Sequence, residues 1–305
     1  MEDQARPPVS VIIPVYNDLQ NLRRCLQHLR RQTWPADRRE VLVVDNGSAE
    51  DLSPLKAEFP EVRWFAEPAP GSYAARNLAI PQASHDILAF IDSDCFAVPG
   101  WMEEGVGHLL GPPAVDVVGG SVRTFAKDPK HPTWAETFEL RYAFPMETYV
   151  KRDRFAGAGN LFTTKAVFDR VGLFRADLKS GGDREWGNRA VDAGMTLEYE
   201  PAACVEHAAR DSMKELWIKR RRTLHGSVQA GKKPAIQGPR KAFARWALNE
   251  LVMPPFEYRS LKRNSPGLGA TTRLKILAVA TVLRYRGLAE AIRIRRGTAG
   301  AAPRR

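Results

Sequence analysis

Short apolar runs alternate with helical patterns along the first hundred residues. The run from Val9 to Ile13 is rich in β-branched residues and predicts a buried strand that Pro14 ends. Asp18 can then cap a helix whose leucines recur every three or four residues. Further strands are predicted at residues 41–44, 62–65 and 87–91, and helices near residues 55, 74 and 101. This alternation predicts an α/β fold with a doubly wound, mainly parallel sheet.

Polar loops follow three of the predicted strands. They are Pro14-Val-Tyr-Asn17, Asp45-Asn-Gly-Ser48 and Asp92-Ser-Asp94. Open α/β sheets bind ligands beyond the carboxyl ends of their strands. We therefore expect these loops to line a ligand site.

Asp92 and Asp94 are two residues apart, which in extended backbone places both carboxylates on one side of the chain. Paired carboxylates suit a hard divalent cation, which also coordinates phosphate oxygens. Two solvated turn aspartates are the alternative. The apolar run that delivers the pair to a strand end favours a metal.

Other polar groups suit a nucleotide and its phosphates. Asp45 can accept hydrogen bonds from a base or ribose, and the turn after it exposes backbone amides. Gly71 opens a predicted helix, and Arg76 lies one turn inside it, an arrangement able to hold a diphosphate or a sugar. Simple helix capping with a surface arginine is the alternative.

The order and separation of these segments resemble the nucleotide-binding half of family 2 glycosyltransferases, which have the GT-A fold. The resemblance continues through Gly157-Ala-Gly-Asn160, which resembles a glycine-rich sugar-site segment, to Ser180-Gly-Gly-Asp-Arg-Glu-Trp186. It covers residues 8 to about 226. It implies an inverting, metal-dependent transfer of sugar from a nucleotide diphosphate to an acceptor hydroxyl.

The resemblance assigns roles to individual residues. The carboxylate that matches Asp183 acts as general base, and Asp94 and His207 match the metal site, which would hold Mg²⁺ or Mn²⁺. The family's usual Glu-Asp pair is here Gly182-Asp183, with Glu185 two positions later. Asp183 and Glu185 are thus both candidates for the base, and we favour Asp183. N-terminal helix stabilisation by acidic residues is the alternative for both.

The remaining expected contacts fall into three groups. The donor nucleotide would contact Pro14, Tyr16, Asn17, Asp45, Asn46, Gly71, Arg76, Asp92 and Ser93. The sugar or acceptor would contact Gly159, Asn160, Glu185 and Trp186. On a helix beginning near Ser212, Arg220 and Arg222 could close over the donor diphosphate.

The predicted domains are a catalytic domain at 1–226 and a basic helical extension at 227–305, joined near a linker at 231–239. The net charge of +11 is uneven, since residues 205–305 carry 23 Lys+Arg against 6 Asp+Glu. Such a surface suits anionic lipid, nucleic acid or a polyphosphate. No nucleic-acid reading motif accompanies it, so we expect no nucleic-acid partner.

The segment from Thr271 to Arg296 mixes apolar and basic residues. It could lie on an anionic membrane, which would suit a lipid-linked acceptor. The alternative is a helix packed on the catalytic domain with an exposed basic side. No apolar stretch approaches the roughly 20 residues that span a bilayer, so no transmembrane helix is predicted.

The start of the chain lacks the features of a signal peptide, and the three cysteines show no disulfide framework. A cytoplasmic location is therefore expected, with peripheral attachment to the inner face of the cell membrane left open by the basic extension.

The sequence leaves the donor open among UDP-, GDP- and dTDP-sugars, and the acceptor open among saccharides and lipid-linked sugars. We favour envelope or extracellular polysaccharide assembly. The chain lacks the Gln-x-x-Arg-Trp segment of processive synthases, so we expect addition of one or a few sugars. The alternatives are a sugar nucleotidyltransferase, whose glycine-rich first loop is missing, and a noncatalytic sugar-nucleotide binding protein.

Overall fold

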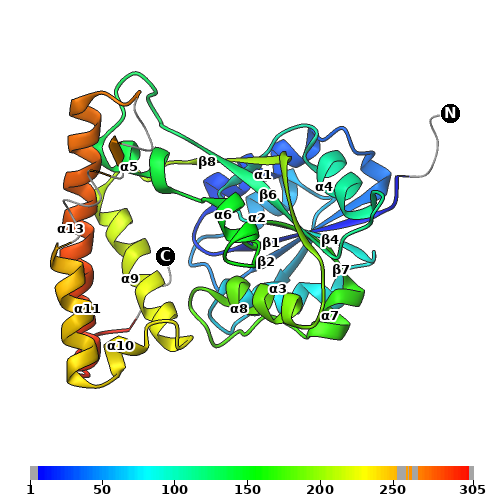
Figure 1. Cartoon of the computed structure of the whole chain (residues 1–305). Coiled ribbons are helices and arrows are strands. Elements are labelled where there is room, and N and C mark those ends of the chain that lie inside the picture. Colours follow the sequence, from blue (N-terminus) through cyan, green and yellow to red (C-terminus); the bar gives the residue numbers. More distant parts are fainter. Residues whose placement is uncertain (1–5, 253–258, 260, 263–266, 302–305) are drawn as a thin grey trace. The chain divides into compact units, whose positions relative to one another are not determined.

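The computed structural model describes residues 6–252, 259, 261–262 and 267–301 (Figure 1). Contacts divide the chain into two compact units. The first comprises the chain up to Arg123 with Phe144–Leu178 and Gly182–His207, and the second comprises Thr124–Ala143, Lys179–Gly181 and the chain from Ala208 onward. The expected boundary at residues 226 and 227 falls inside helix α9 (Met213–Gln229) of the second unit.

An eight-stranded sheet with the order β3-β2-β1-β4-β7-β6-β8-β5 runs through the first unit. Its strands are β1 (Val9–Val15), β2 (Arg39–Asp45), β3 (Arg63–Ala66), β4 (Ile87–Ile91), β5 (Cys95–Ala97), β6 (Val117–Phe125), β7 (Asn160–Thr164) and β8 (Leu197–Ala208). The first four in this order pair in parallel, whereas β7 pairs antiparallel with both β4 and β6, and β5 with β8. The α/β fold expected from the sequence is confirmed, with an antiparallel portion added to the parallel one.

Two local predictions need correction. Strand β1 continues through Pro14 to Val15. Its pairing with β4 stops at Ile12, so the missing N–H of proline interrupts no bond to that neighbour. Asp18 occupies the N-cap position of the next helix, but its carboxylate accepts a hydrogen bond from Asn21 (2.9 Å) instead of from a helical N–H.

Helices cover both faces of this sheet. They are α1 (Leu19–Arg30), the short 3-10 helix η1 (Ala36–Arg38), α2 (Ser53–Glu58), α3 (Ser72–Gln82), α4 (Trp101–Leu110), α6 (Met146–Lys151), α7 (Lys165–Val171) and α8 (Gly182–Asp192). Figure 1 shows α1 and α4 on one side of the sheet and α3, α7 and α8 on the other. This layering follows from the apolar faces that each helix must bury.

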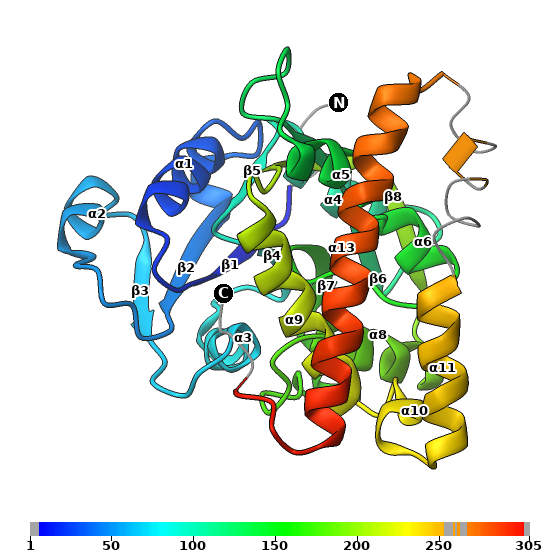
Figure 2. The same ribbon diagram turned by 90° about the vertical axis from the view of Figure 1, so that its left-hand side faces the viewer.

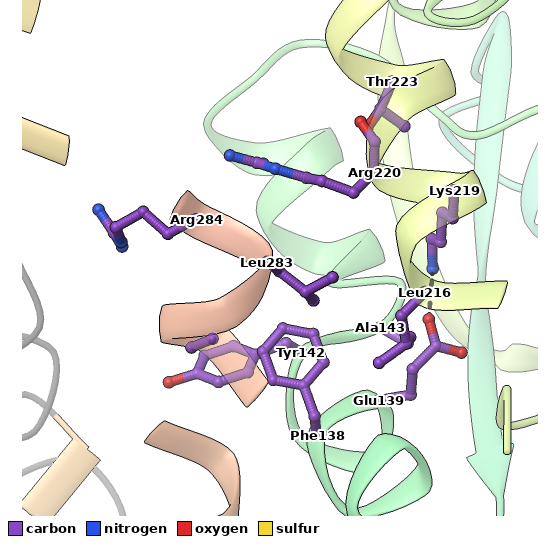
Figure 3. Close-up of a pocket in the computed structure, with 11 residues that line it drawn as sticks. Phe138, Glu139, Tyr142, Ala143, Leu216, Lys219, Arg220, Thr223, Leu283 and Arg284 are labelled. Atoms are coloured by element: carbon purple, nitrogen blue, oxygen red, sulfur yellow. Dashed lines mark hydrogen bonds and ion pairs between the residues drawn. The ribbon is translucent and has the colours of Figure 1, made fainter. Parts of the chain in front are cut away.

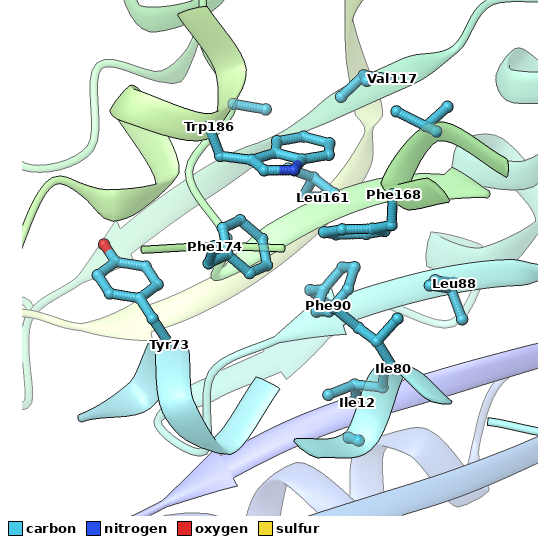
Figure 4. Close-up of a cluster of buried hydrophobic side chains, with 14 of the residues drawn as sticks. Ile12, Tyr73, Ile80, Leu88, Phe90, Val117, Leu161, Phe168, Phe174 and Trp186 are labelled. Atoms are coloured by element: carbon cyan, nitrogen blue, oxygen red, sulfur yellow. The ribbon is translucent and has the colours of Figure 1, made fainter. Parts of the chain in front are cut away.

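Aromatic side chains fill the interface between the sheet and helices α3, α7 and α8 (Figure 4). Phe168 stacks on Trp186 with ring centroids 4.7 Å apart, and Phe174 meets Phe90 edge to face at 5.8 Å. Phe90 and Trp186 are fully buried. This packing fixes helix α8, whose first turn carries Asp183, against strand β4, which leads to Asp92.

The second unit is helical. Its helices are α5 (Trp134–Tyr142), α9 (Met213–Gln229), α10 (Pro234–Gln237), α11 (Arg240–Val252) and α13 (Ala270–Arg295). Helix α13 contacts α5, α9, α10 and α11, and Figures 1 and 2 both show it running alongside α9 and α11. A helical C-terminal part was expected, and the structure contains it.

Helix α13 buries one side against its neighbours. Ile276, Val279 and Leu283 lie inside, with Leu216 of α9 and Ala135 of α5 in the same cluster. Basic residues of α13 also bond within the unit. Arg284 pairs with Glu250 (3.3 Å), and Arg295 donates to the carbonyls of Ile236 and Gly238 (3.0 and 2.7 Å).

The segment expected to be a linker contains α10, whose Ile236 is fully buried. Ile236 packs with Leu224 and Val228 of α9 and with Ala291 of α13. Among the helices that the structure describes, none is long and apolar enough to cross a membrane.

Candidate active site

The loops after β1 and β2 are tied to each other at the carboxyl ends of these strands. Asn17 donates its backbone N–H to the Ser48 hydroxyl (2.8 Å), and its side-chain oxygen accepts the Ala49 N–H (2.7 Å). Asp45 accepts the Ser48 N–H (3.0 Å). Asn17 has a positive φ of 48°, which asparagine adopts more readily than most residues. These hydrogen bonds join the two loops into one polar rim.

Asn46 connects this rim to the start of α3. Its buried side chain donates to the carbonyls of Glu67 (2.9 Å) and Ala69 (2.7 Å) and accepts the Gly71 N–H (2.6 Å). Gly71 has a φ of 135°, which favours glycine. Asn46 therefore sets the backbone before α3.

Arg76 of α3 reaches the end of β4. Its guanidinium forms an ion pair with Asp92 and donates to the carbonyl of Ala158 (3.3 Å). The Arg76 side chain is 3% exposed, whereas that of Asp92 is 43% exposed. Asp92 therefore has one carboxylate oxygen held by the protein and a face open to a ligand.

Gly159 lies directly against this carboxylate. A Cβ atom at Gly159 would stand 2.8 Å from Oδ2 of Asp92, closer than real Cβ contacts allow. A side chain at Gly159 would therefore require the Asp92 carboxylate to shift. The glycine-rich segment therefore supports the position of Asp92.

Asp94 lies beside His207 because strands β5 and β8 pair. The register sets Cys95 opposite His207, and Nε2 of His207 is 3.4 Å from Oδ2 of Asp94. The Phe144 ring packs on the imidazole with centroids 4.7 Å apart. Buried Nδ1 of His207 has no hydrogen-bond partner among the residues that the structure describes. The structure thus brings together the two residues expected to bind metal.

The donor set fits a divalent cation in part. A carboxylate and an imidazole both coordinate Mn²⁺, and Mg²⁺ prefers oxygen. Within the described residues, no group of three His, Cys, Asp or Glu side chains converges on one point. The chain offers two ligands here, so phosphate oxygens and water would have to supply the others.

Asp183 lies at the first turn of α8. Its Oδ1 accepts the Tyr73 hydroxyl (3.1 Å) and the Arg184 N–H (2.8 Å), and its Oδ2 accepts the Ala158 N–H (3.4 Å). Burial raises the pKa of the Asp183 carboxyl above its ordinary value, and the bonds from Arg184 and Tyr73 oppose that rise. A Cβ at Gly182 would stand 2.7 Å from the Tyr73 ring, so this glycine allows the approach.

Asp92 and Asp183 flank the same short stretch of backbone. The Ala158 carbonyl accepts a hydrogen bond from Arg76, which also pairs with Asp92, and the Ala158 N–H donates to Asp183. Segments near residues 76, 92, 158 and 183 therefore meet at one site. A sugar transfer with Asp183 as the base would require this arrangement.

Tyr73 was not singled out from the sequence. It lies three residues before Arg76, so both side chains leave the same face of α3, a spacing that could have indicated its role.

Other predicted residues lie in the interior. Asn160 is fully buried: its oxygen accepts the Trp101 indole N–H (2.8 Å), and its amide donates to the carbonyls of Ser121 and Ala203 (both 2.8 Å). Trp186 is also fully buried and donates to the Gly172 carbonyl (2.9 Å). In this structure, both side chains serve packing and present no face to a sugar.

Three further predicted residues are placed as follows. Glu185 bonds to Arg189 one turn along α8 (3.1 Å), so its carboxylate has a helix-stabilising partner that Asp183 lacks. Pro14 and Ser93 are buried beside the loops. Tyr16 is half-buried at the end of β1.

Arg220 and Arg222 belong to the second unit, on α9. Arg220 is exposed and Arg222 half-buried. Their expected contact with a donor diphosphate stays a prediction.

Comparison with known proteins decides the family. The family model described as "Glycosyl transferase family 2" matches residues 10–173. The chain belongs to glycosyl transferase family 2. It is similar to the glycosyltransferase AglE of Haloferax volcanii, with 37% identity over 90% of this chain and 91% of that protein. Family membership makes the chain a glycosyltransferase and removes the nucleotidyltransferase alternative.

Two further similarities fit this family. The pre-mycofactocin glycosyltransferase of Mycobacterium tuberculosis is 30% identical over 73% of this chain, which spans 48% of that relative's length. Among solved structures, mannosyltransferase PcManGT from Pyrobaculum calidifontis, in complex with GDP-Man and Mn²⁺, has a TM-score of 0.61 at 18% identity and covers 95% of this chain and 87% of that one. This second likeness supports the GT-A fold.

Proposed function

We propose that this family 2 enzyme transfers a single sugar from a nucleotide diphosphate to an acceptor hydroxyl, with inversion at the anomeric carbon and with help from a divalent cation. The observation that carries the proposal is the meeting of Asp183 and Asp92 across Ala158. Family membership supports the glycosyl transfer, and the neighbouring structure with GDP-Man and Mn²⁺ supports the donor class.

Asp183 acts as the general base. Its Oδ1 already accepts two hydrogen bonds, whereas Oδ2 accepts only a long one, so Oδ2 is the atom to receive a proton. As the acceptor oxygen forms its bond to the anomeric carbon, its proton passes to Oδ2. The bond between that carbon and the phosphate oxygen breaks, and the nucleotide diphosphate leaves on the opposite side.

The polar rim and the β4 end hold the donor. Asp45 and Asn17 face the nucleotide, Arg76 keeps Asp92 in place beside the sugar, and Asp94 with His207 would hold the cation together with the donor phosphates. Such a cation neutralises the charge of the departing diphosphate. The donor base stays open among UDP, GDP and dTDP, and the acceptor is a saccharide or a lipid-linked sugar in envelope or extracellular glycan assembly.

The test starts with a screen of donor hydrolysis over UDP-, GDP- and dTDP-sugars, with Mg²⁺ or Mn²⁺. With the donor so found, Asp183→Asn is expected to lower transfer by roughly 10²–10⁴-fold while donor binding by calorimetry changes little. Glu185→Gln is the matched control, because it removes a carboxylate two residues away that has its own arginine partner. It is expected to retain most activity.

Asp94→Ala tests the metal independently of the base. It should abolish the Mn²⁺-dependent part of donor binding. Full activity in Asp183→Asn would refute the base assignment. Tight donor binding with no transfer to any saccharide or lipid-linked acceptor, in the unchanged protein, would favour a noncatalytic sugar-nucleotide binding protein.

A further inference from the structure

A cavity of about 490 Å³ opens within the second unit, and its lining includes none of the residues described around Asp92 and Asp183. Helices α5, α9 and α13 form its walls. It is lined by Phe138, Glu139, Tyr142, Ala143, Leu216, Lys219, Arg220, Thr223, Ala280, Leu283 and Arg284. The volume lies in the range of roughly 300–1,000 Å³ that small-ligand sites occupy.

The lining has an apolar end and a cationic end, with the ion pair of Glu139 and Lys219 along one side (Figure 3). In that view, Phe138 and Tyr142 lie at one end, beyond Leu283, whereas Arg220, Thr223 and Arg284 lie at the other. A ligand that fills the cavity would therefore need an apolar body and a polar, negatively charged head.

The charges of the lining favour an anion. Lys219 and Arg284 each pair with a carboxylate, Glu139 at 2.8 Å and Glu250 at 3.3 Å. Arg220 is exposed, and across the described part of the chain its guanidinium makes neither an ion pair nor a hydrogen bond. Desolvation by the surrounding helices lowers the pKa of Arg220, the charge of Glu250 opposes this and that of Arg284 adds to it, but arginine remains charged at neutral pH. A phosphate would give this guanidinium the bidentate partner it suits.

The helices around the cavity also expose apolar side chains. Trp134, Leu140 and Tyr142 of α5 are 51%, 44% and 43% exposed, and Val282 and Tyr285 of α13 are 45% and 44% exposed. Exposed apolar side chains mark surfaces that meet a membrane or another apolar partner where they lie next to one another. A ligand drawn from a membrane would enter past such residues.

We propose that this cavity binds the phosphate head and the first part of the chain of an isoprenoid or other long-chain alkyl phosphate, the carrier half of a lipid-linked acceptor. Arg220 contacts the phosphate, and Phe138, Tyr142 and Leu283 contact the chain. This assignment deepens the proposed function and depends on it for the role of the ligand as acceptor carrier.

Farnesyl phosphate is a suitable probe, and its binding to the full chain can be measured by calorimetry beside farnesol and inorganic phosphate. The unchanged protein should bind farnesyl phosphate at least about 10-fold more tightly than either, since only this probe carries both halves. Arg220→Gln should weaken the binding of farnesyl phosphate about 10-fold and leave the binding of farnesol unchanged. The matched control Lys214→Gln removes an exposed charge on the same helix, outside the cavity, and should change neither.

A second pair of variants tests the apolar end. Tyr142→Ser should weaken the binding of both farnesyl phosphate and farnesol. Tyr285 is about equally exposed but absent from the lining, so Tyr285→Ser should weaken the binding of neither. Equal affinity for farnesyl phosphate and inorganic phosphate, or equal binding by Arg220→Gln and Lys214→Gln, would overturn the assignment. So would displacement of farnesyl phosphate by GDP or UDP, because Arg220 would then serve the donor diphosphate.

These results are separable from the proposed function. Donor hydrolysis, and the Mn²⁺-dependent donor binding that Asp94→Ala should abolish, need no lipid, so a failure of farnesyl phosphate to bind would leave the glycosyl transfer standing. Conversely, lipid phosphate binding in a protein that hydrolyses no donor would leave the cavity assignment standing alone.

Discussion

Two residues of helix α3, Arg76 and Tyr73, position the carboxylates of the candidate active site. Arg76 is buried beside Asp92, and Tyr73 donates its hydroxyl to Asp183, so one face of α3 positions both carboxylates. The Arg76 guanidinium pairs with the charge of Asp92 and orients its carboxylate, because it bonds to both Asp92 and the Ala158 carbonyl. Tyr73 contributes a hydrogen bond to the ionised form of the proposed base, which makes it a positioning residue with a measurable effect on pKa.

Tyr73→Phe should shift the acid limb of the pH profile to higher pH. Burial raises the pKa of Asp183, and the Tyr73 hydroxyl lowers it. A base works only when deprotonated, so the rate falls as the pH drops through that pKa. Without the hydroxyl, the pKa of Asp183 rises further, and the acid limb of kcat/KM against pH should move to higher pH.

Tyr199→Phe is the control for this change, because Tyr199 packs against the same core but is not bonded to Asp183. Its acid limb should match that of the unchanged enzyme. A Tyr73→Phe enzyme with lower activity but an unmoved limb would show that the tyrosine serves packing alone.

The sequence predicted part of this residue-level arrangement. Polar residues that follow buried strands are recognisable, because parallel strands end at a common edge, and Asp45, Asp92 and Asp94 were found in this way. Contacts across the fold were not recognisable from local pattern. The burial of Asn160 depends on Trp101, Ser121 and Ala203, which lie far from it in sequence. Nothing near Asn160 distinguishes a ligand amide from a structural one.

At the scale of elements, the strands with continuous apolar runs were predicted with nearly correct bounds. Strand β4 was predicted at residues 87–91 and occupies Ile87–Ile91. The antiparallel pairing of β7 with β4 and β6 was not predicted. The alternation of strands and helices carries no information on strand direction once the connections become irregular. The segment between residues 97 and 160 has that irregular character, because it contains α4, β6, α5 and α6, of which α5 belongs to the second unit.

Helices of the second unit are joined through buried carboxylates. Glu290 of α13 is 1% exposed and accepts Arg221 (2.6 Å) and His225 (2.8 Å) of α9, with Arg293 at 3.5 Å. Glu139 of α5 is 2% exposed and pairs with Arg210 and Lys219. Of the basic residues in the segment 271–296, which could either lie on a membrane or pack on the protein, Arg293 is one of these partners.

Glu290→Gln should destabilise the second unit by about 3 kcal/mol at pH 7, because it leaves partly buried cations without their counter-charge. Burial alone would raise the pKa of Glu290, but hydrogen bonds from Arg221 and His225 bring it below the ordinary value. A lowered pKa stabilises the fold above the unfolded pKa of about 4.3, and that stabilisation is lost as the pH falls through the folded value. The difference between variant and unchanged protein should therefore narrow below about pH 4.3.

Urea unfolding followed by circular dichroism, between pH 7 and the acid limit of the fold, measures this difference. Glu215→Gln, at an exposed position in the first turn of α9, makes the same chemical change and should cost a few tenths of a kcal/mol. Equal losses in the two variants would mean that the Glu290 pairs add nothing beyond surface electrostatics.

At the scale of the whole molecule, charge and exposed apolar area gather in the same part of the chain. Residues 205–305 carry a net charge of +17, against −6 for the residues before them. Of the large apolar side chains exposed in the described residues, all except Leu110 and Leu173 belong to the second unit. A surface with both properties fits an anionic membrane, which attracts basic residues and accepts apolar ones.

The full chain should therefore sediment with vesicles that contain phosphatidylglycerol, less with phosphatidylcholine vesicles, and less again as salt rises, since surface charges are screened. Leu274, Val282 and Tyr285 span about 80° around α13, so they can meet one surface together. The double variant Leu274→Ser and Tyr285→Ser should lower the bound fraction. Leu110→Ser, with a leucine 48% exposed in the first unit, should not.

The two contributions can be told apart by salt. Loss of the apolar contacts should lower binding at every salt concentration, whereas screening should act on the double variant as strongly as on the unchanged protein, because its charges are intact. Equal binding to both vesicle types would exclude the basic residues from the interaction. Equal losses in the double variant and in Leu110→Ser would exclude this face of α13, and the basic extension would then serve the packing of the second unit alone.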